Sequence, residues 1–258
     1  MTPLTFIAAF VFYNLCVFLQ KRYLFPHADE FLPPPLVPWE AGHEHAFIVS
    51  PDYWWAFRFK ARMTGSVDPE RRSGLLKRYV TQNNTANLIV SALLFVACSA
   101  TYAQTEKSNL FALLSWVAVI RYVSRSYEIT YAFGRDVIVP MPSTTGLSKH
   151  ERIRLALVSY VEIFLYSAAA YLALPSVECP ISALSLSLNV GTLTNVGLAF
   201  SGQNTSFVVN LVFIQVVTTH SLVVLSLAAY LARNDDVCRT TSSGEAHAPS
   251  GTRAAGPS

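Results

Sequence analysis

The chain has 258 residues, of which 52% are apolar and only 14% are Asp, Glu, Lys or Arg. Soluble domains carry about 25% charged residues, so this composition indicates a membrane protein and excludes intrinsic disorder for the body of the chain. The formal net charge is only +3, and Lys and Arg never form a block longer than two, which argues against a nucleic-acid partner.

Five segments could cross a bilayer, whose hydrocarbon core takes about 20 helical residues. They are residues 3–20, 86–103, 110–120, 155–174 and 207–232. The first has no charge and no cleavage site typical of a signal peptide, so we expect a retained anchor. The second and third are separated by six polar residues and predict a helical hairpin. The third is short, because Arg121 follows only eleven apolar or uncharged residues, but an arginine near a helix end can reach the headgroups. The sequence therefore predicts an all-α integral membrane protein with five transmembrane helices.

The distribution of Lys and Arg predicts how these spans are oriented. Residues 21–85, 104–109, 121–154, 175–206 and 233–258 contain nine, one, six, none and three of them. Short cytoplasmic loops retain basic residues, so the alternation places the N-terminus outside and the C-terminus in the cytoplasm. We expect a multi-pass protein of the plasma membrane with this orientation.

The segments between the spans have distinct compositions. Seven prolines between residues 24 and 80 favour extended segments rather than a compact core, and the run YWWAFRFKAR at 53–62 is typical of a headgroup-level segment. The resulting division is a 1–20 anchor, a 21–85 cytoplasmic insert, an 86–123 transmembrane hairpin, a 124–153 juxtamembrane segment, a 154–232 C-terminal module and a 233–258 disordered tail.

Enzyme chemistry and metal binding find no support in the sequence. Motifs for hydrolysis, redox chemistry and phosphate binding are absent, and the four cysteines do not have the spacing of a zinc site or a redox pair. His43, Glu44 and His45 are interpreted as a solvated loop. We therefore expect no catalytic residues, no metal site and no cofactor.

Residues 179–203, between the last two spans, carry no charge and are rich in Ser, Thr, Asn and Gly. Non-helical backbone at membrane depth is found only where it is buried in protein or lines a water-filled cavity. A re-entrant pore helix and loop fits this segment better than a sixth span, which would place the C-terminus outside.

The motif TLTNVG at 192–197 resembles the selectivity-filter signature TxTTVGYGD of the potassium-channel pore-loop superfamily, with ISALSLSLNV in the place of the pore helix. Residues 124–137, 147–165 and 214–232 resemble the flanking parts of bacterial two-transmembrane channels of that superfamily. The resemblance covers residues 121–233 and leaves the part of the chain before Arg121 unassigned.

The resemblance implies a cation-channel subunit that assembles with itself, as a tetramer, in the lipid bilayer. Its transported ion would be a monovalent cation such as potassium, held by backbone carbonyls. The implied filter residues are Thr194, Asn195, Val196, Gly197 and Leu198. Gly197 is expected to supply the left-handed conformation that such a filter uses.

The filter is degenerate, because Asn195, Leu198, Ala199 and Phe200 all differ from the family signature. These differences predict weak conduction or conduction that is not selective among monovalent cations. The alternative is a non-conducting membrane scaffold or sensor that retains the pore-domain fold.

Three polar residues within the spans are further candidates, since ionisable groups at membrane depth are usually functional or paired. Glu162 is expected to accept hydrogen bonds from a neighbouring helix or from Arg121, with a relay role as the alternative. Thr219 and His220 lie near the middle of the last span, where His220 would form a pH-sensitive ring if it lines a cavity. Otherwise it is a packed histidine bonded to a backbone carbonyl.

Overall fold

The computed structural model describes residues 3–24, 46–66, 69–103, 109–138, 146–174, 177–197 and 206–227. Every regular element in these ranges is helical. The α-helices are α1 (Pro3–Leu24), α2 (Ala46–Val49), α3 (Pro51–Ser66), α4 (Pro69–Tyr102), α5 (Asn109–Ile138), α6 (Lys149–Tyr171), α7 (Pro180–Gly191) and α9 (Ser206–His220). A π-helix, η1 (Ser221–Leu227), continues α9. The expected all-α class is confirmed for these residues.

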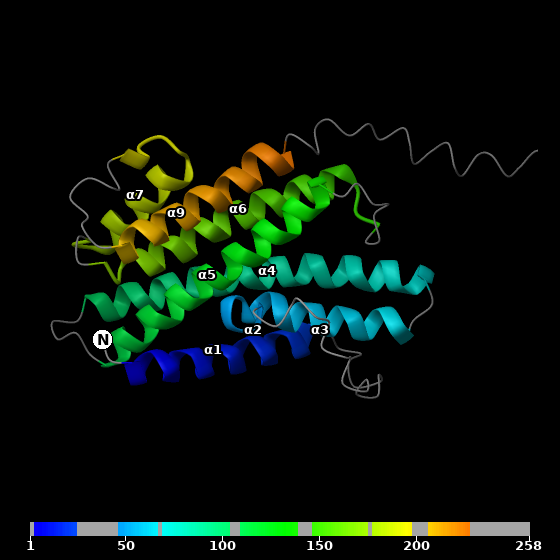
Figure 1. Cartoon of the computed structure of the whole chain (residues 1–258), viewed down its shortest axis with the longest axis horizontal. Helices are drawn as coiled ribbons and strands as arrows, with labels where there is room; N and C mark the ends of the chain where they lie inside the picture. Colours follow the sequence, from blue (N-terminus) through cyan, green and yellow to red (C-terminus); the bar gives the residue numbers. More distant parts are fainter. Residues whose placement is uncertain are drawn as a thin grey trace, which may run out of the picture.

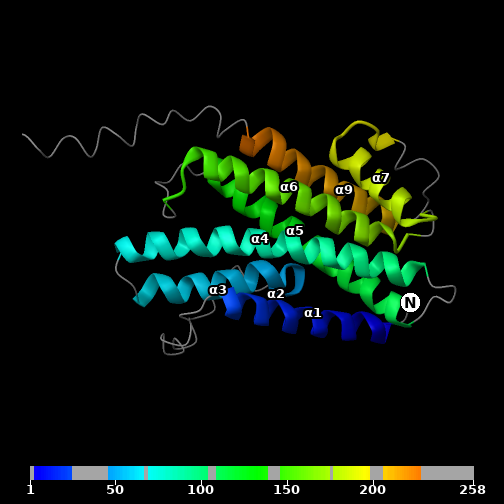
Figure 2. The ribbon, with the colours of Figure 1, turned by 180° about the vertical axis from the view of Figure 1, so that it is seen from behind.

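The helices form a bundle organised around α5. Figures 1 and 2 show α1, α2 and α3 on one side of α4 and α5, and α6, α7 and α9 on the other. Helix α5 packs against α1, α3, α4, α6 and α9, while α7 packs mainly on α6. The N-terminal helices and the C-terminal module therefore meet at α5 and α6.

Four helices have the length and apolar composition needed to cross a membrane: Pro3–Leu24, Arg72–Tyr102, Lys149–Tyr171 and Phe207–Val224. They correspond to the first, second, fourth and fifth spans expected from the sequence. The third expected span lies in α5, which is not among them because Arg121, Arg125 and Glu128 interrupt its apolar residues. The length and composition of these four helices thus indicate a membrane protein.

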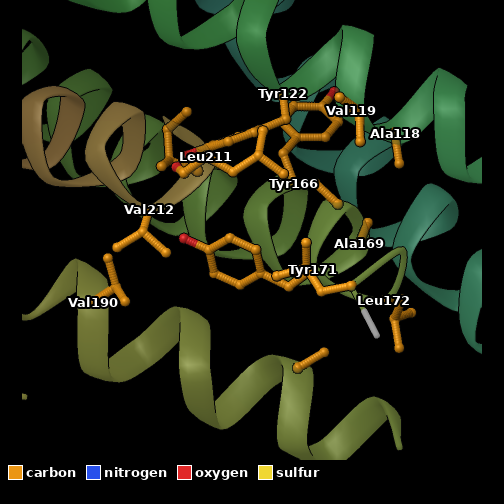
Figure 3. Packing of buried hydrophobic residues seen from close by; sticks show 14 of the residues in the cluster. Ala118, Val119, Tyr122, Tyr166, Ala169, Tyr171, Leu172, Val190, Leu211 and Val212 are labelled. Carbon is orange, nitrogen blue, oxygen red and sulfur yellow. Dashed lines mark hydrogen bonds between the residues drawn. The ribbon is translucent and has the colours of Figure 1, made fainter. Parts of the chain in front are cut away.

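Tyrosine and alanine side chains form the centre of the main core. Figure 3 shows Tyr122, Tyr166 and Tyr171 packed between α5, α6 and α9. Residues 168–170 are consecutive alanines with no exposed surface, and such small side chains let neighbouring helices approach closely. The tyrosine hydroxyls are satisfied within the bundle, since Tyr122 Oη donates to the Leu211 carbonyl at 2.9 Å.

Residues 46–66 and 69–85 are not the extended insert that the prolines predicted, because both are helical. Pro51 stands at the first position of α3, where its missing N–H costs nothing. Trp55 and Phe59 of α3 then pack against Phe18 of α1, with ring centroids 4.8 and 6.3 Å apart. Within the YWWAFRFKAR run, Trp55 and Phe59 therefore pack into the bundle.

Several expectations concern residues outside the described ranges. They are the loop with His43, Glu44 and His45, the prolines at 33–35, the filter position Leu198, and the tail at 233–258.

Candidate functional site

Helix α7 runs back along α6 from the end where α6 finishes. The Cys179 thiol caps its first turn by accepting from the Ser182 amide at 3.4 Å, and Pro180 follows at the first helical position. Ser187 lies beside Ser167, with 2.7 Å between their hydroxyls, and Tyr160 Oη donates to the Gly191 carbonyl at 3.1 Å. Tyr160 precedes Tyr171 by eleven residues, or about 16 Å of helix, so α7 ends roughly halfway along α6.

Gly191 is the point of closest approach between α7 and α6. A Cβ atom at this position would lie 1.9 Å from Phe164 Cε1 and 2.9 Å from Gln215 Nε2. Gln215 in turn joins α7 to the rest of the module, since it donates to the Ser187 carbonyl at 2.8 Å and accepts from Tyr171 Oη at 2.6 Å. Close packing and buried hydrogen bonds therefore fix where α7 ends.

We expect Gly191→Ala to destabilise the folded protein by about 1–3 kcal/mol, because the Phe164 ring has to move to admit the methyl group. Thermal unfolding in detergent, followed by circular dichroism, measures the effect. Gly197→Ala is the matched control, because nothing lies within 4 Å of a Cβ atom there. Equal losses of stability in the two variants would show that the α6–α7 contact is not tightly packed.

The residues after α7 form a helix-ending turn. The Leu193 amide donates to the Val190 carbonyl at 3.1 Å, and the Thr194 amide donates to the Asn189 carbonyl at 3.2 Å. These two bonds are those of a Schellman motif, whose left-handed residue is here Leu193, with φ of 59°. A non-glycine residue pays roughly 1–2 kcal/mol for that conformation. Gly197 has no positive φ, so the left-handed residue expected at that position is four residues earlier.

The filter residues expected from the sequence lie in or after this turn. Thr194, Asn195 and Gly197 are exposed, and Val196 is half-buried against the main core. Val196 and Gly197 are helical rather than extended. The exposed Thr192 hydroxyl donates to the Leu188 carbonyl at 2.7 Å and lies 2.9 Å from the Thr194 hydroxyl. A short polar surface of hydroxyl and amide groups thus stands at the end of α7.

On the opposite side of α6 the bundle contains a buried ionic network, which begins at Asp52 near the start of α3. Its carboxylate accepts from Arg121 Nη1 at 2.7 Å and from the Tyr13 hydroxyl, and Lys21 Nζ lies 3.5 Å away. Lys21 also donates to Asn83 Oδ1 at 2.7 Å. These contacts join α1, α3, α4 and α5.

The second part of the network is centred on Arg125, one turn further along α5. Its Nε donates to Glu162 Oε1 at 2.6 Å, and its Nη1 donates to Glu128 at 2.6 Å. Asn84 Oδ1 accepts from Arg125 at 3.2 Å and from Ser159 at 2.9 Å. Glu162 therefore accepts hydrogen bonds from a neighbouring helix, as expected, but from Arg125.

Arg121, the partner considered for Glu162 from the sequence, binds elsewhere. Besides Asp52, its guanidinium donates to Tyr166 Oη at 3.0 Å and to Asn87 Oδ1 at 2.7 Å. The network as a whole is balanced, because three cations face three carboxylates. These residues are Lys21, Arg121, Arg125, Asp52, Glu128 and Glu162.

Sequence reasoning missed most of this network. It assigned Lys21 and Asp52 to a cytoplasmic insert, and Arg125 and Glu128 to a juxtamembrane segment. The available signal was the i, i+4 spacing of Arg121 and Arg125, which places both on one face of a helix.

The other two polar candidates from the sequence, Thr219 and His220, belong neither to the turn after α7 nor to the ionic network. Thr219 is buried and donates to the Gln215 carbonyl at 2.6 Å, so its hydroxyl is satisfied within its own helix. His220 is exposed at the last residue of α9, where η1 begins, and is not the packed histidine considered above.

Comparison with known proteins places the chain in no family, since no family model, curated protein or solved structure matches it. Among the residues that the structure describes, no three His, Cys, Asp or Glu side chains are grouped to hold a metal ion. The function is therefore argued from the site itself.

Proposed function

We propose that the chain is a subunit of an oligomeric cation channel, in which α6, α7 and α9 form the pore module. The order of elements supports this proposal: a long helix, a short helix that returns along it, a polar turn and a second long helix. This order is the one expected for a re-entrant pore helix and loop between two spans. The proposed transported ion is a monovalent cation such as potassium.

One observation carries the proposal. Thr192, Thr194 and Asn195 are exposed in the single chain, yet they lie at the end of α7, about halfway along the apolar helix α6. Exposed polar side chains and irregular backbone at that depth are typical of sites that face water or another protein surface rather than lipid. A second copy of the chain, or a water-filled pore between copies, supplies that environment.

The proposal also includes the topology. Helix α5 crosses the membrane in addition to the four apolar helices, which makes five spans. Its Arg121, Arg125 and Glu128 are paired within the bundle, which lowers the cost of placing them at membrane depth. Helices α4 and α6 begin at the same end of the bundle, where Lys77 pairs with Glu151 at 2.8 Å (Figure 1). In the proposed topology the protein lies in the plasma membrane, this basic end faces the cytoplasm, and the N-terminus is outside.

This orientation predicts that Cys179 reacts with a membrane-impermeant maleimide in intact cells. The Ser182 hydroxyl and amide lower the pKa of the Cys179 thiol, so labelling should persist at a pH where an ordinary thiol reacts slowly. Cys179→Ser is the control that assigns the label. Labelling of Cys238 but not of Cys179 in intact cells would reverse the proposed orientation.

Conduction is tested with purified protein in liposomes, by measuring potassium and sodium flux. One pore module cannot enclose a pore, so we expect a tetramer by detergent-corrected mass, with weak or non-selective flux. Thr192→Ala should reduce the flux. Thr81→Ala is the matched control, because Thr81 is also an exposed helical threonine whose hydroxyl donates to the carbonyl four residues earlier, at 3.0 Å. A monomer would contradict the proposal.

The Schellman turn favours a second candidate function, a non-conducting membrane scaffold or sensor. The turn folds residues 192–194 as a helix cap and binds their amides to carbonyls of α7, which differs from an extended, carbonyl-lined filter. A tetramer that passes no cations, with Thr192→Ala indistinguishable from Thr81→Ala, would support this second function over the first.

A further inference from the structure

A cluster of aromatic rings joins α3 to the second half of α5. Tyr53 contacts Tyr131 and Tyr127 edge to face, with ring centroids 4.8 and 5.8 Å apart, and Tyr127 stacks on Tyr131 at 6.2 Å. Phe57 stacks on Tyr53 at 6.3 Å. Arg135 lies one turn beyond Tyr131 on the same stripe of α5, since Tyr127, Tyr131 and Arg135 are spaced by four. We call these five residues the aromatic–arginine face.

The face is open to the surroundings of the bundle. Its four aromatic residues are half-buried and Arg135 is exposed. Burial and the Tyr131 hydroxyl raise the pKa of Tyr53, whereas Arg135 lowers it, so the guanidinium is within electrostatic reach of this hydroxyl. A tyrosine hydroxyl is able to donate a hydrogen bond to an anionic group.

The position of the face in the bundle identifies its surroundings. Arg135 is near the end of α5, at the end of the bundle where α4 and α6 begin (Figure 2). Lys77 and Arg154 lie in the first third of those two helices. Tyrosine rings followed by a basic residue are typical of the boundary between acyl chains and headgroups.

We propose that the aromatic–arginine face binds an anionic phospholipid of the leaflet at the basic end. Arg135 contacts the headgroup phosphate, the tyrosine hydroxyls donate to the phosphate or glycerol oxygens, and the rings pack against the upper acyl chains. The charge of the face selects the partner, since no carboxylate belongs to these five residues and a zwitterionic headgroup offers less net attraction. This inference does not depend on conduction by the pore module.

The test uses the full chain in mild detergent, titrated with phosphatidylglycerol, phosphatidylcholine or inorganic phosphate. Native mass spectrometry counts bound lipid, and the shift of the thermal unfolding midpoint reports its effect. We expect phosphatidylglycerol to bind more tightly than phosphatidylcholine, and inorganic phosphate to have no effect. Arg135→Gln should weaken phosphatidylglycerol binding about fivefold, the loss expected for one basic contact at a membrane surface.

Arg154→Gln is the matched control, because Arg154 is an exposed arginine at the same end of the bundle but on α6. Equal weakening by both substitutions would mean that the whole basic end attracts lipid diffusely, and would overturn the assigned face. Equal binding of the two phospholipids would also overturn it, and an effect of inorganic phosphate would identify a site for free anions. Arg135 is exposed, so its replacement tests binding without removing a core contact.

Discussion

Glu162→Leu is expected to lower the free energy of unfolding by about 3–5 kcal/mol. Glu162 has no exposed surface, and its two oxygens accept from Arg125 at 2.6 and 3.0 Å. Leucine leaves the Arg125 Nε donor buried without its acceptor, while Nη2 keeps only the Asn84 oxygen at 3.2 Å and Nη1 keeps Glu128. Equilibrium unfolding in detergent or bicelles measures the loss.

Two comparisons separate charge from shape and burial. Glu162→Gln retains an acceptor for Arg125 and should lose less stability than Glu162→Leu, with assembly preserved. Glu151→Leu, on the same helix, removes an exposed carboxylate that pairs with Lys77 and accepts from the Ser148 amide, and should lower the stability clearly less than Glu162→Leu. If glutamine and leucine at residue 162 were tolerated equally, the carboxylate would have no structural role.

A double substitution tests whether the pair acts as a unit. Arg125→Met combined with Glu162→Leu removes both charges, so the combined loss should be smaller than the sum of the two single losses. Strict additivity would show that Arg125 and Glu162 do not interact energetically.

Asp52→Asn is expected to cost about 3–5 kcal/mol and to release the start of α3 from the bundle. Asp52 is the carboxylate that Arg121 and Lys21 share, so its neutralisation leaves two buried cations with neutral acceptors only. A cysteine at Ser50, in a background with the four native cysteines replaced by serine, reports the release. Ser50 is buried and donates to the Ser124 carbonyl at 2.7 Å, so we expect Ser50→Cys to be labelled only when Asp52→Asn is also present.

Tyr13→Phe is the control for this experiment, because it removes one hydrogen-bond donor to Asp52 without changing any charge. It should cost about 1 kcal/mol and leave Ser50→Cys unlabelled. Absence of labelling in the Asp52→Asn variant would show that apolar contacts of α3, such as Trp55 on Phe18, are sufficient to hold it.

The network also has a consequence for the proposed pore module. Glu162 faces Arg125 on one side of α6, whereas Tyr160 and Phe164 contact Gly191 of α7 on another side. The same part of α6 therefore contacts both α5, through Glu162, and the end of α7. Loss of the Arg125–Glu162 ion pair should therefore also disturb the polar turn after α7, because this part of α6 contacts both.

The sequence by itself determined the helical membrane class and the four spans that the structure contains. Length and apolar composition are local properties, because a helix satisfies its own backbone and needs only about 20 apolar residues to cross a bilayer. The uncharged segment before α9 could also be recognised as containing a turn. The helix α7 and the Thr, Gly and Asn residues that follow it are neighbours in the chain, so a local pattern contains them.

Only the tertiary structure decided which buried charges are partners and where α3 lies. Arg121 and Asp52 are 69 residues apart, and Arg125 and Glu162 are 37 apart. A buried charge without a partner is too costly, so a partner could be expected for Glu162. The cost of leaving Glu162 unpaired does not depend on which arginine pairs with it, so it could not distinguish Arg121 from Arg125. Likewise, Gly191 lies against Phe164, 27 residues earlier in the chain, and no local pattern contains that contact.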